Sequence, residues 1–389
     1  MIKIAFQMMG GASWTFGPVY LKDLFNVLRR SDNERLKLFL LAPDGQESRD
    51  YAMSVSSDNN IFYNTRRYDS VKNRLERRFL SRDLMTEKLL IEEGVSVLFG
   101  PVIPYRYIKV ATLSWIPDFQ HVHLPDMFSD KEKTDRSKVF LRSAKNATRI
   151  VVLSNAVKDD FKSFAPEYVD KVRVFRPVSL VPPSIYDRDP GWITKKYDIP
   201  EKFFFLPNQF WKHKNHEIVF RAVRELSERR INVTVVCAGN IRDYRNPVHF
   251  DDLCRRLSEW KITDNVKIIG LVPKEDILTL IRQSICVINP SLFEGFGNTV
   301  EETRAVGKRL ILSDIPPHHE QNPPKAFYFD AHDSGDLSEK MAVVWRESNP
   351  GPDLDLEKDA IRDLPGRVNA YLETFVSITK EALEEMEKK

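Results

Sequence analysis

Short apolar stretches alternate with amphipathic ones along the whole chain. In the first half, β-branched and aromatic residues concentrate at 2–8, 36–42, 95–99, 110–114, 149–153 and 171–175. Apolar residues at helical spacing predict helices between these stretches, at 19–30, 84–93, 134–146 and 156–164. Apolar strands that are separated by helices are typical of parallel sheets built from βαβ units. The first half therefore predicts a parallel sheet covered by helices.

The alternation is interrupted by a proline-rich segment and then begins again. Residues 177–191 contain four prolines and a glycine, a composition that indicates an interdomain linker. Beyond it, strands are predicted at 203–206, 233–238, 266–270, 286–289, 309–313 and 326–329. We predict an α/β protein with two Rossmann-like, doubly wound parallel-sheet domains that face each other across a cleft. The expected boundaries are 1–180 for the N-terminal domain, 181–195 for the linker and 196–350 for the C-terminal domain.

The last segment of the chain has the pattern of a long amphipathic helix. Its apolar face is formed by Val368, Tyr371, Leu372, Phe375 and Ile378. From these residues alone, the helix belongs to the surface of the second domain or crosses back to pack on the first.

Composition and charge narrow the class of protein. The chain has 389 residues, 42% of them apolar and 30% charged, which fits two globular domains and excludes a mainly disordered protein. The 59 basic and 56 acidic residues are nearly balanced, which argues against a nucleic-acid binder. Cys237, Cys254 and Cys286 form no paired spacing, so we expect neither a disulfide framework nor a zinc site. With no signal peptide or spanning segment recognisable, we expect a cytoplasmic protein.

The strongest local signal is the segment 290–307, with the sequence PSLFEGFGNTVEETRAVG. A predicted buried strand leads into a glycine-containing turn and then into a helix. Gly295 and Gly297 allow the backbone to approach a ligand closely. Asn298 followed by Glu301 predicts a capping box at the helix start. Free N–H groups and the helix dipole would make this helix start an anion site.

Two carboxylates flank that site. Glu294 and Glu302 are separated by seven residues. Carboxylates would repel a phosphate, but one carboxylate can accept hydrogen bonds from two sugar hydroxyls. This spacing therefore favours a ligand with both phosphate and sugar groups. The alternative is an ordinary strand–turn–helix joint with two solvated acids.

The sequence EGFGNTVEE resembles the E-x7-E motif of the family-4 retaining glycosyltransferases of GT-B fold, which include bacterial polysaccharide enzymes. The resemblance implies that Glu294 contacts the donor sugar and Glu302 the ribose of a nucleotide-diphosphate sugar. It also implies that the donor is bound by the turn and helix start, at Gly295, Phe296, Gly297, Asn298 and Thr299. By the same resemblance, the N-terminal domain binds the acceptor, and the terminal helix, 366–388, crosses back to it.

A second segment, 208–216, supports the resemblance. The family places a lysine before Asn or Gly in this loop, where it meets the diphosphate, and Lys214 matches it. The family's earlier arginine is absent. Asn208 and Gln209 occupy its neighbourhood, and Lys212 is the candidate for a second positive charge. After a later strand, the resemblance places Leu271 and Val272 beside the nucleotide base, although such residues are more often part of a core.

The first domain supplies further candidates. Gly10 and Gly11 follow the first strand without the G-x-G-x-x-G spacing of a dehydrogenase, and they resemble the glycine loop that lies against the donor. In the segment 115–125, many family members carry a His-Asp pair whose histidine touches the donor sugar. This chain has Pro117 before Asp118, so we expect His121 to take that role with Asp118 as its neighbour. His123 is the alternative, and two histidines at this spacing are a weak metal signal.

The resemblance implies a metal-independent retaining glycosyltransferase that needs no cofactor and uses a glycan or lipid-linked acceptor. The D-x-D patterns at 187–189 and 353–355 follow no predicted buried strand, so we expect no metal site. The alternatives are a nucleotide-sugar epimerase-like enzyme and a non-catalytic nucleotide-sugar-binding subunit. The basic segment 66–82 has apolar residues at helical spacing. It predicts either peripheral contact with the inner face of a membrane or a solvated helix face.

Overall fold

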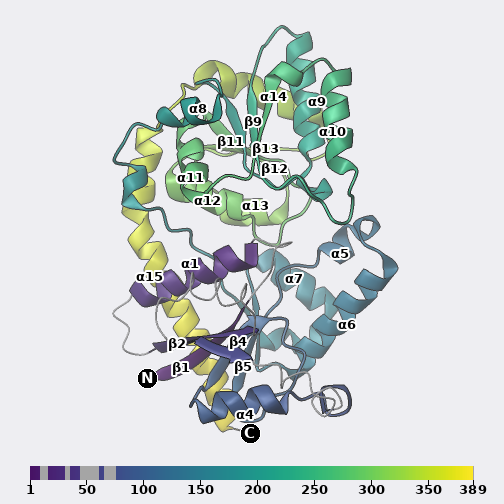
Figure 1. Cartoon of the computed structure of the whole chain (residues 1–389), viewed down its shortest axis with the longest axis vertical. Helices are drawn as coiled ribbons and strands as arrows, with labels where there is room; N and C mark the ends of the chain where they lie inside the picture. Colours follow the sequence, from purple (N-terminus) through teal and green to yellow (C-terminus); the bar gives the residue numbers. More distant parts are fainter. Residues whose placement is uncertain (9–15, 31–35, 44–60, 65–75, 389) are drawn as a thin grey trace. The chain divides into compact units, whose positions relative to one another are not determined.

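The structure is a computed structural model that describes residues 1–8, 16–30, 36–43, 61–64 and 76–388 (Figure 1). It divides into two compact units. The N-terminal unit comprises Met1–Val122, Ser129–Val178 and Arg367–Lys389, and the C-terminal unit comprises His123–Phe128 and Ser179–Gly366. Each unit is built around its own sheet.

The sheet of the N-terminal unit is parallel throughout the described residues. Its seven strands have the order β3-β2-β1-β4-β5-β6-β7. Their bounds are Ile2–Gln7 (β1), Leu36–Pro43 (β2), Ile61–Asn64 (β3), Val97–Pro101 (β4), Ala111–Trp115 (β5), Arg149–Val152 (β6) and Val172–Val174 (β7). All six strands predicted in this half are present. The prediction missed β3.

The helices of this unit lie between the strands, as predicted. They are α1 (Phe16–Arg30), α4 (Leu84–Glu92), α5 (Gln120–His123), α6 (Asp130–Asn146) and α7 (Asn155–Phe164), with 3-10 turns at Pro125–Met127 and Pro166–Lys171. Ser129 and Glu132 form a capping box that fixes the start of α6. The Oγ of Ser154 accepts a hydrogen bond from the Val157 N–H and fixes the start of α7.

The sheet of the C-terminal unit is parallel too, and its six described strands have the order β10-β9-β8-β11-β12-β13. Their bounds are Phe204–Leu206 (β8), Val235–Ala238 (β9), Val266–Gly270 (β10), Cys286–Asn289 (β11), Leu310–Ser313 (β12) and Phe327–Phe329 (β13). From the central pair β8 and β11, the chain winds outward in opposite directions. Such a reversal leaves a crevice at the carboxyl ends of the two central strands, where ligands of open α/β sheets bind.

Helices cover both faces of this sheet (Figure 1). Phe204 and Leu206 pack on the side of α9 (His216–Glu228), α10 (His249–Glu259) and α14 (Ser334–Glu347). Phe203 and Phe205 pack on the side of α8 (Trp192–Tyr197), α11 (Lys274–Gln283) and α12 (Asn298–Val306). The remaining elements are α13 (Pro316–Gln321) and 3-10 turns at Pro183–Ile185, Lys212–Lys214 and Thr263–Asn265. Alternate residues of a strand point to opposite faces, so this sheet is doubly wound.

The proline-rich segment, for which the composition predicts an interdomain linker, packs against a hydrophobic core. Residues 181–195 lie within the C-terminal unit. Val181, Ile185 and Ile193 are buried in the same core as α11 and α12. The prolines limit the segment to short turns, but its apolar side chains are withdrawn from water and hold it against the unit.

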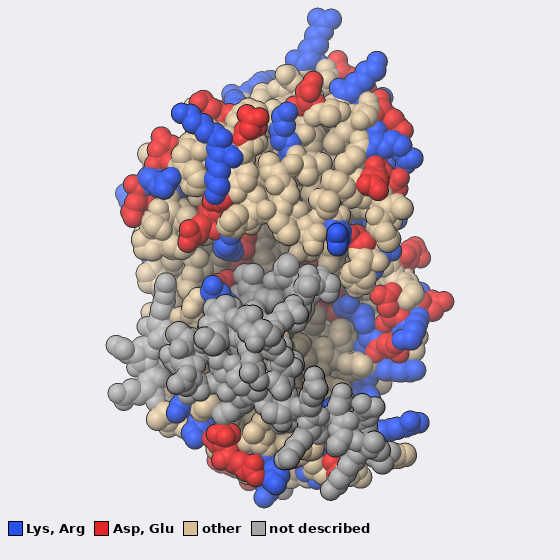
Figure 2. All heavy atoms as spheres, in the orientation of Figure 1, with Lys and Arg blue, Asp and Glu red and all other residues tan. Residues whose placement is uncertain are grey.

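Charged side chains on the surface are paired and mixed in sign. Arg221 lies 2.5 Å from Glu217, Arg255 2.6 Å from Asp252, and Arg229 2.7 Å from Glu339. Figure 2 shows Lys and Arg side chains interspersed with Asp and Glu side chains over the described surface in that view. This mixture accords with the nearly balanced charge of the sequence.

The terminal helix α15 (Leu354–Glu387) belongs to both units. Near its start, the Glu357 carboxylate accepts two hydrogen bonds, at 2.7 and 3.2 Å, from the guanidinium of Arg282. Both side chains are buried. From Arg367 onward the helix is part of the N-terminal unit.

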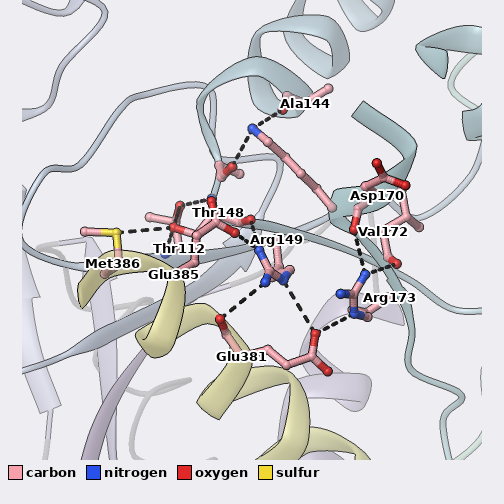
Figure 3. Close-up of polar contacts among 12 residues, drawn as sticks. Thr112, Ala144, Thr148, Arg149, Asp170, Val172, Arg173, Glu381, Glu385 and Met386 are labelled. Atoms are coloured by element: carbon pink, nitrogen blue, oxygen red, sulfur yellow. Dashed lines mark hydrogen bonds and ion pairs between the residues drawn. The ribbon is translucent and has the colours of Figure 1, made fainter. Parts of the chain in front are cut away.

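The second half of α15 completes the core of the N-terminal unit. Tyr371 stacks on Phe175 with ring centroids 4.2 Å apart, and Phe375 stacks on Phe6 at 5.8 Å. Figure 3 shows Glu381 between Arg149 and Arg173, and Arg173 lies 2.7 Å from its carboxylate. The helix is therefore fixed to this unit by ring packing and by ion pairs.

Candidate active site

The central feature of the site is an ion pair between the loops that follow β8 and β11. The Nζ of Lys214 donates to Oε1 of Glu294 at 2.6 Å. Lys214 lies just before α9, and Glu294 lies in the turn between β11 and α12. These loops meet because β8 and β11 are neighbours at the point where the strand order reverses. The structure thus brings together Lys214 and Glu294, which the sequence analysis selected 80 residues apart.

Burial and a cation act in opposite directions on the Glu294 carboxyl. Burial raises its pKa, but the adjacent Lys214 lowers the pKa by more than burial raises it, and the resulting pKa is about 2. Glu294 is therefore ionised at neutral pH. The pair carries no net charge, so it does not repel an incoming anion.

A chain of buried polar groups fixes this arrangement. The Nδ2 of Asn208 donates to Oδ1 of Asn289 at 3.2 Å, and the Thr299 hydroxyl donates to Oδ1 of Asn208 at 3.1 Å. The Oγ of Ser291 lies within hydrogen-bond distance of both Asn289, at 2.8 Å, and Glu294, at 2.7 Å. These contacts tie together the two loops and the start of α12. Asn208 and Thr299 therefore act in the site as positioning groups.

The start of α12 differs from the prediction. Gly297, not Asn298, precedes the first helical residue, and no side chain caps the helix. The predicted capping box is wrong because the buried Glu301 carboxylate accepts the N–H of Ser179 at 2.9 Å. Gly297 has a φ of +96°, a left-handed conformation that L side chains rarely adopt. An uncapped helix start with free backbone donors remains suited to an anion.

The turn before α12 is held from behind. The Nε2 of Gln321 donates to the carbonyl oxygens of Phe296, at 2.5 Å, and Gly297, at 3.0 Å. Phe296 itself is buried, whereas Gly295 and Asn298 are partly exposed. The Phe296 ring therefore points inward, and the backbone at Gly295 and Asn298 is partly accessible.

A second ion pair lies one turn into α12. Glu302 pairs with Lys274, the first residue of α11. Their side chains are 20% and 36% exposed, compared with 11% for Glu294 and 19% for Lys214. The sequence analysis selected Glu302 but missed Lys274. The only signal that could have found it is its position just after the loop expected to contact the base.

Buried histidines surround the first pair. Burial lowers the pKa of His213 to about 3 and that of His318 to about 4, so both rings are neutral at pH 7. The Nδ1 of His318 lies 2.9 Å from the carbonyl oxygen of Ser313, and the Ser313 hydroxyl donates to the Ser291 carbonyl at 2.6 Å. The sequence analysis missed both histidines. His318 lies in the loop after β12, the neighbour of β11, and that adjacency is the signal for it.

The other predicted donor residues of this unit lie nearer the surface. Lys212 has an exposed side chain, and its N–H donates to Asp243 at 3.0 Å. Gln209 is partly exposed, and its carbonyl oxygen accepts the N–H of Trp211 at 2.8 Å. Leu271 is 67% exposed, whereas Val272 packs partly buried against the core. Leu271 therefore has an apolar surface available to a ligand.

Of the candidate residues predicted in the first domain, His121 and Asp118 belong to the N-terminal unit, not to the unit that contains this network. Gly10 and Gly11 lie outside the described residues. His121 is buried in the N-terminal unit, with Nε2 3.2 Å from Ser137 Oγ, and burial lowers its pKa to about 4. The Oδ1 of Asp118 accepts one hydrogen bond from Arg136, at 3.0 Å, and one from the Gln120 N–H, at 2.9 Å.

His123, the alternative to His121, groups with the C-terminal unit. It belongs to the segment His123–Phe128. Its ring is exposed and stacks on Phe293, with centroids 4.9 Å apart. Phe293 directly precedes Glu294, so His123 lies beside the turn that carries the first carboxylate.

Metal-ligand clusters and membrane-spanning helices are two further features that bear on function. Among the described residues, no group of three or more His, Cys, Asp or Glu side chains is arranged to hold a metal ion. The D-x-D carboxylates have local partners: Asp189 accepts the Gly191 N–H at 2.7 Å, and Asp353 pairs with Arg309 at 3.4 Å. Within the part of the chain that the structure describes, no helix is long and apolar enough to cross a membrane.

Comparison with known families gives a likeness for this unit. Residues 193–358 match the model of the family described as Glycosyl transferases group 1. This segment is therefore similar to the domains of that family. It contains both lysine–glutamate pairs, and also the polar chain from Asn208 to Thr299 and the start of α12.

Curated relatives resemble about half of the chain at low identity. An uncharacterized glycosyltransferase of Methanocaldococcus jannaschii is 23% identical over 214 residues, which cover 51% of this chain and 52% of that protein. The O-antigen chain mannosyltransferase RfbU of Salmonella typhimurium is 26% identical over 224 residues, 56% of each chain. The chain spans about half the length of the curated relatives that it matches.

Solved structures resemble nearly the whole chain in fold. A glycosyltransferase from Rickettsia africae has a TM-score of 0.68 at 17% identity and covers 98% of both chains. HepE of Anabaena, solved in complex with UDP and glucose, has a TM-score of 0.67 at 13% identity and covers 100% of both chains. These likenesses and the two parallel sheets confirm the predicted α/β architecture of the GT-B type.

Proposed function

We propose that the protein is a metal-independent retaining glycosyltransferase that moves a sugar from a nucleotide-diphosphate donor to a glycan or lipid-linked acceptor. One observation carries the proposal: Lys214 and Glu294 form an ion pair at 2.6 Å, and Glu294 lies in the turn that leads into the uncapped start of α12. A cation and a helix start can hold a diphosphate, and a carboxylate can hold sugar hydroxyls. The match of residues 193–358 to the Glycosyl transferases group 1 family supports the same reaction class.

Each group has a distinct task in this proposal. Lys214 and the N–H groups at the start of α12 stabilise the charge that develops on the leaving diphosphate. Glu294 orients the donor sugar, Glu302 binds the ribose, and Leu271 contacts the base. The N-terminal unit binds the acceptor, while its candidates Gly10, Gly11 and His121 are assigned to the donor.

The proposed chemistry needs no enzymatic nucleophile. The acceptor oxygen bonds to the anomeric carbon on the face from which the diphosphate departs, so the configuration is retained. The bond from the anomeric carbon to the phosphate oxygen breaks, and that oxygen takes the acceptor proton. Preorganised donors at the leaving group supply the main stabilisation of the transition state. Lys214 and the helix dipole thereby do the work for which other enzymes use a metal ion.

The test is turnover of a panel of UDP-, GDP- and dTDP-sugars, measured as nucleotide release with and without acceptors. Glu294→Gln is expected to lower turnover by about 10²–10³. Glu275→Gln, on the exposed side of α11, is the matched control and should retain full activity. Retention predicts that the product has the anomeric configuration of the donor, which NMR measures. Activity that requires added Mn²⁺ after EDTA treatment would refute metal independence.

A second function is favoured by one specific difference from the family. Asn208 and Gln209 stand where an arginine is expected, so the site has one fixed cation fewer. An epimerase-like enzyme or a non-catalytic nucleotide-sugar-binding subunit would tolerate that loss. Donor binding by calorimetry without turnover on any acceptor would support this alternative over transfer.

We also propose that the protein works in the cytoplasm, in peripheral contact with the inner face of the membrane through the segment 66–82. Residues 66–75 lie outside the described residues. In the remainder, Phe79 and Leu80 are 74% and 58% exposed beside Arg77 and Arg78. Exposed apolar side chains next to cations suit an anionic lipid surface. Phe79→Ser with Leu80→Ser should reduce sedimentation with anionic vesicles, and neutral vesicles serve as the control.

A further inference from the structure

We infer that Lys274 is a specificity-determining residue of the donor site, which together with Glu302 recognises the two hydroxyls of the ribose. The inference rests on the proposed function, because it assigns a residue to the nucleotide that the site would bind. It goes beyond the E-x7-E motif, which contains Glu302 and not Lys274. The observation that carries it is the ion pair between these two side chains, on different helices.

The position of Lys274 has no explanation within its own helix. It is the first residue of α11, where the positive end of the helix dipole disfavours a cation. The acidic residues that suit this position follow it, as Glu275 and Asp276. An ion pair as exposed as Lys274–Glu302 contributes little to folding. Stability of α11 therefore does not account for a lysine at this position.

The chain places Lys274 next to the proposed base contact. Gly270 ends β10 with a φ of +71°, and the following residue, Leu271, is largely exposed. Lys274 comes three residues later, and its side chain returns to Glu302 on α12. One short loop thus carries an exposed apolar surface for a planar base and, next to it, a cation–carboxylate pair. In a nucleotide, the base and the ribose are likewise next to each other.

The chemistry of the pair fits a hydroxyl better than either charge alone. An ammonium has three N–H donors, and only one is needed for Glu302. A second can donate to a ribose hydroxyl oxygen, while that hydroxyl donates its own proton to the carboxylate. The hydroxyl is then satisfied as donor and as acceptor. The pair is neutral overall, so it does not repel the diphosphate of the same nucleotide.

This arrangement predicts discrimination between ribose and deoxyribose. Without the 2′-hydroxyl, one N–H of Lys274 and one lone pair of Glu302 lose their ligand partner. Hydrogen bonds to charged groups are stronger than neutral ones, and sites built around them reject ligands that lack the group. We expect UDP to bind about tenfold more tightly than 2′-deoxy-UDP, and GDP about tenfold more tightly than 2′-deoxy-GDP for a guanine-selective site.

The experiment is calorimetric titration of the full-length protein with UDP, GDP and their 2′-deoxy forms. Lys274→Met should weaken binding of the ribonucleotide about tenfold and reduce the ribose preference to about twofold or less. Lys195→Met, an exposed lysine of α8, is the matched control and should behave as the wild type. Glu302→Gln should also abolish the preference, and the double variant should lose little more than either single one.

The outcomes separate this inference from the function on which it rests. A wild type that binds ribo and deoxyribo forms equally, or a Lys274→Met variant that keeps the full preference, overturns the role of Lys274 and leaves the glycosyltransferase proposal standing. Failure of the wild type to bind any nucleotide overturns both. A structural role alone would lower the melting temperature of Lys274→Met and leave the ratio of the two affinities unchanged.

Discussion

The two lysine–glutamate pairs at α12 have the same chemistry in different surroundings. Glu294 is 11% exposed, receives Lys214 at 2.6 Å and lies within reach of the Ser291 hydroxyl. Glu302 is 20% exposed and Lys274 36%. A buried pair is costly to break, because removal of one partner leaves an uncompensated charge, whereas an exposed pair rearranges at little cost. The comparison indicates a rigid group where we propose that the sugar binds, and an adaptable one where we propose that the ribose binds.

The largest effect is expected from Lys214→Met. It leaves the ionised Glu294 buried without a cation, which should lower the free energy of unfolding by roughly 3 kcal/mol. Turnover should fall by about 10²–10³, because the leaving group loses its cation. Urea unfolding and nucleotide release measure the two effects. Adding Glu294→Gln should restore most of the stability and none of the activity; a double variant as unstable as the single one would contradict the buried-pair explanation.

A smaller loss of stability is expected when a substitution strains the backbone at Gly297, close to Glu294. Gly297→Ala forces an alanine to a φ of +96°, which should cost about 1–3 kcal/mol and displace the helix start that receives the diphosphate. Nucleotide affinity should therefore fall together with stability. Gly307→Ala, at the other end of α12, has a φ of +86° and is the comparison variant. Its added carbon would lie 2.5 Å from the Glu357 backbone, so it should lower stability without a specific loss of affinity.

The more exposed pair, Lys274–Glu302, should show the opposite: a small effect on stability and a clear effect on donor binding. Lys274→Met is expected to change the free energy of unfolding by no more than about 0.5 kcal/mol. Its effect should appear in the donor KM and leave kcat unchanged, because a ribose contact is made equally in the ground state and the transition state. Steady-state kinetics and urea unfolding measure both. A loss of stability as large as that of Lys214→Met would abolish the distinction between the pairs.

The last expected effect is the dependence of stability on pH. The folded-state pKa values of His213 and His318, about 3 and 4, lie below the usual 6.5. The unfolded chain therefore binds more protons, and stability should decrease as the pH falls from about 6.5 toward 4. Glu294, with its pKa lowered to about 2, loses its contribution only as the pH falls below about 4.5. His318→Gln should flatten the upper part of this dependence by up to one proton, as measured by unfolding between pH 5 and pH 7.5.

The fold was predictable because its strands are continuous apolar runs. Twelve strands followed from that pattern, whereas β3 was missed. The sequence also located Glu294, Glu302 and Lys214, since each belongs to a local motif. It did not locate Lys274 or His318, whose partners lie on other elements. The capping box failed for the same reason, because Ser179, far away in the sequence, takes the carboxylate of Glu301.

Because α15 belongs to both units, it has a consequence for biosynthesis. Phe375 packs on Phe6 and Phe99, so the N-terminal unit lacks part of its core until the ribosome has translated α15. The strands of this unit are translated earlier and have an apolar face uncovered during that time, at risk of association with other nascent chains. A premature stop codon before Arg367 would leave that face permanently bare.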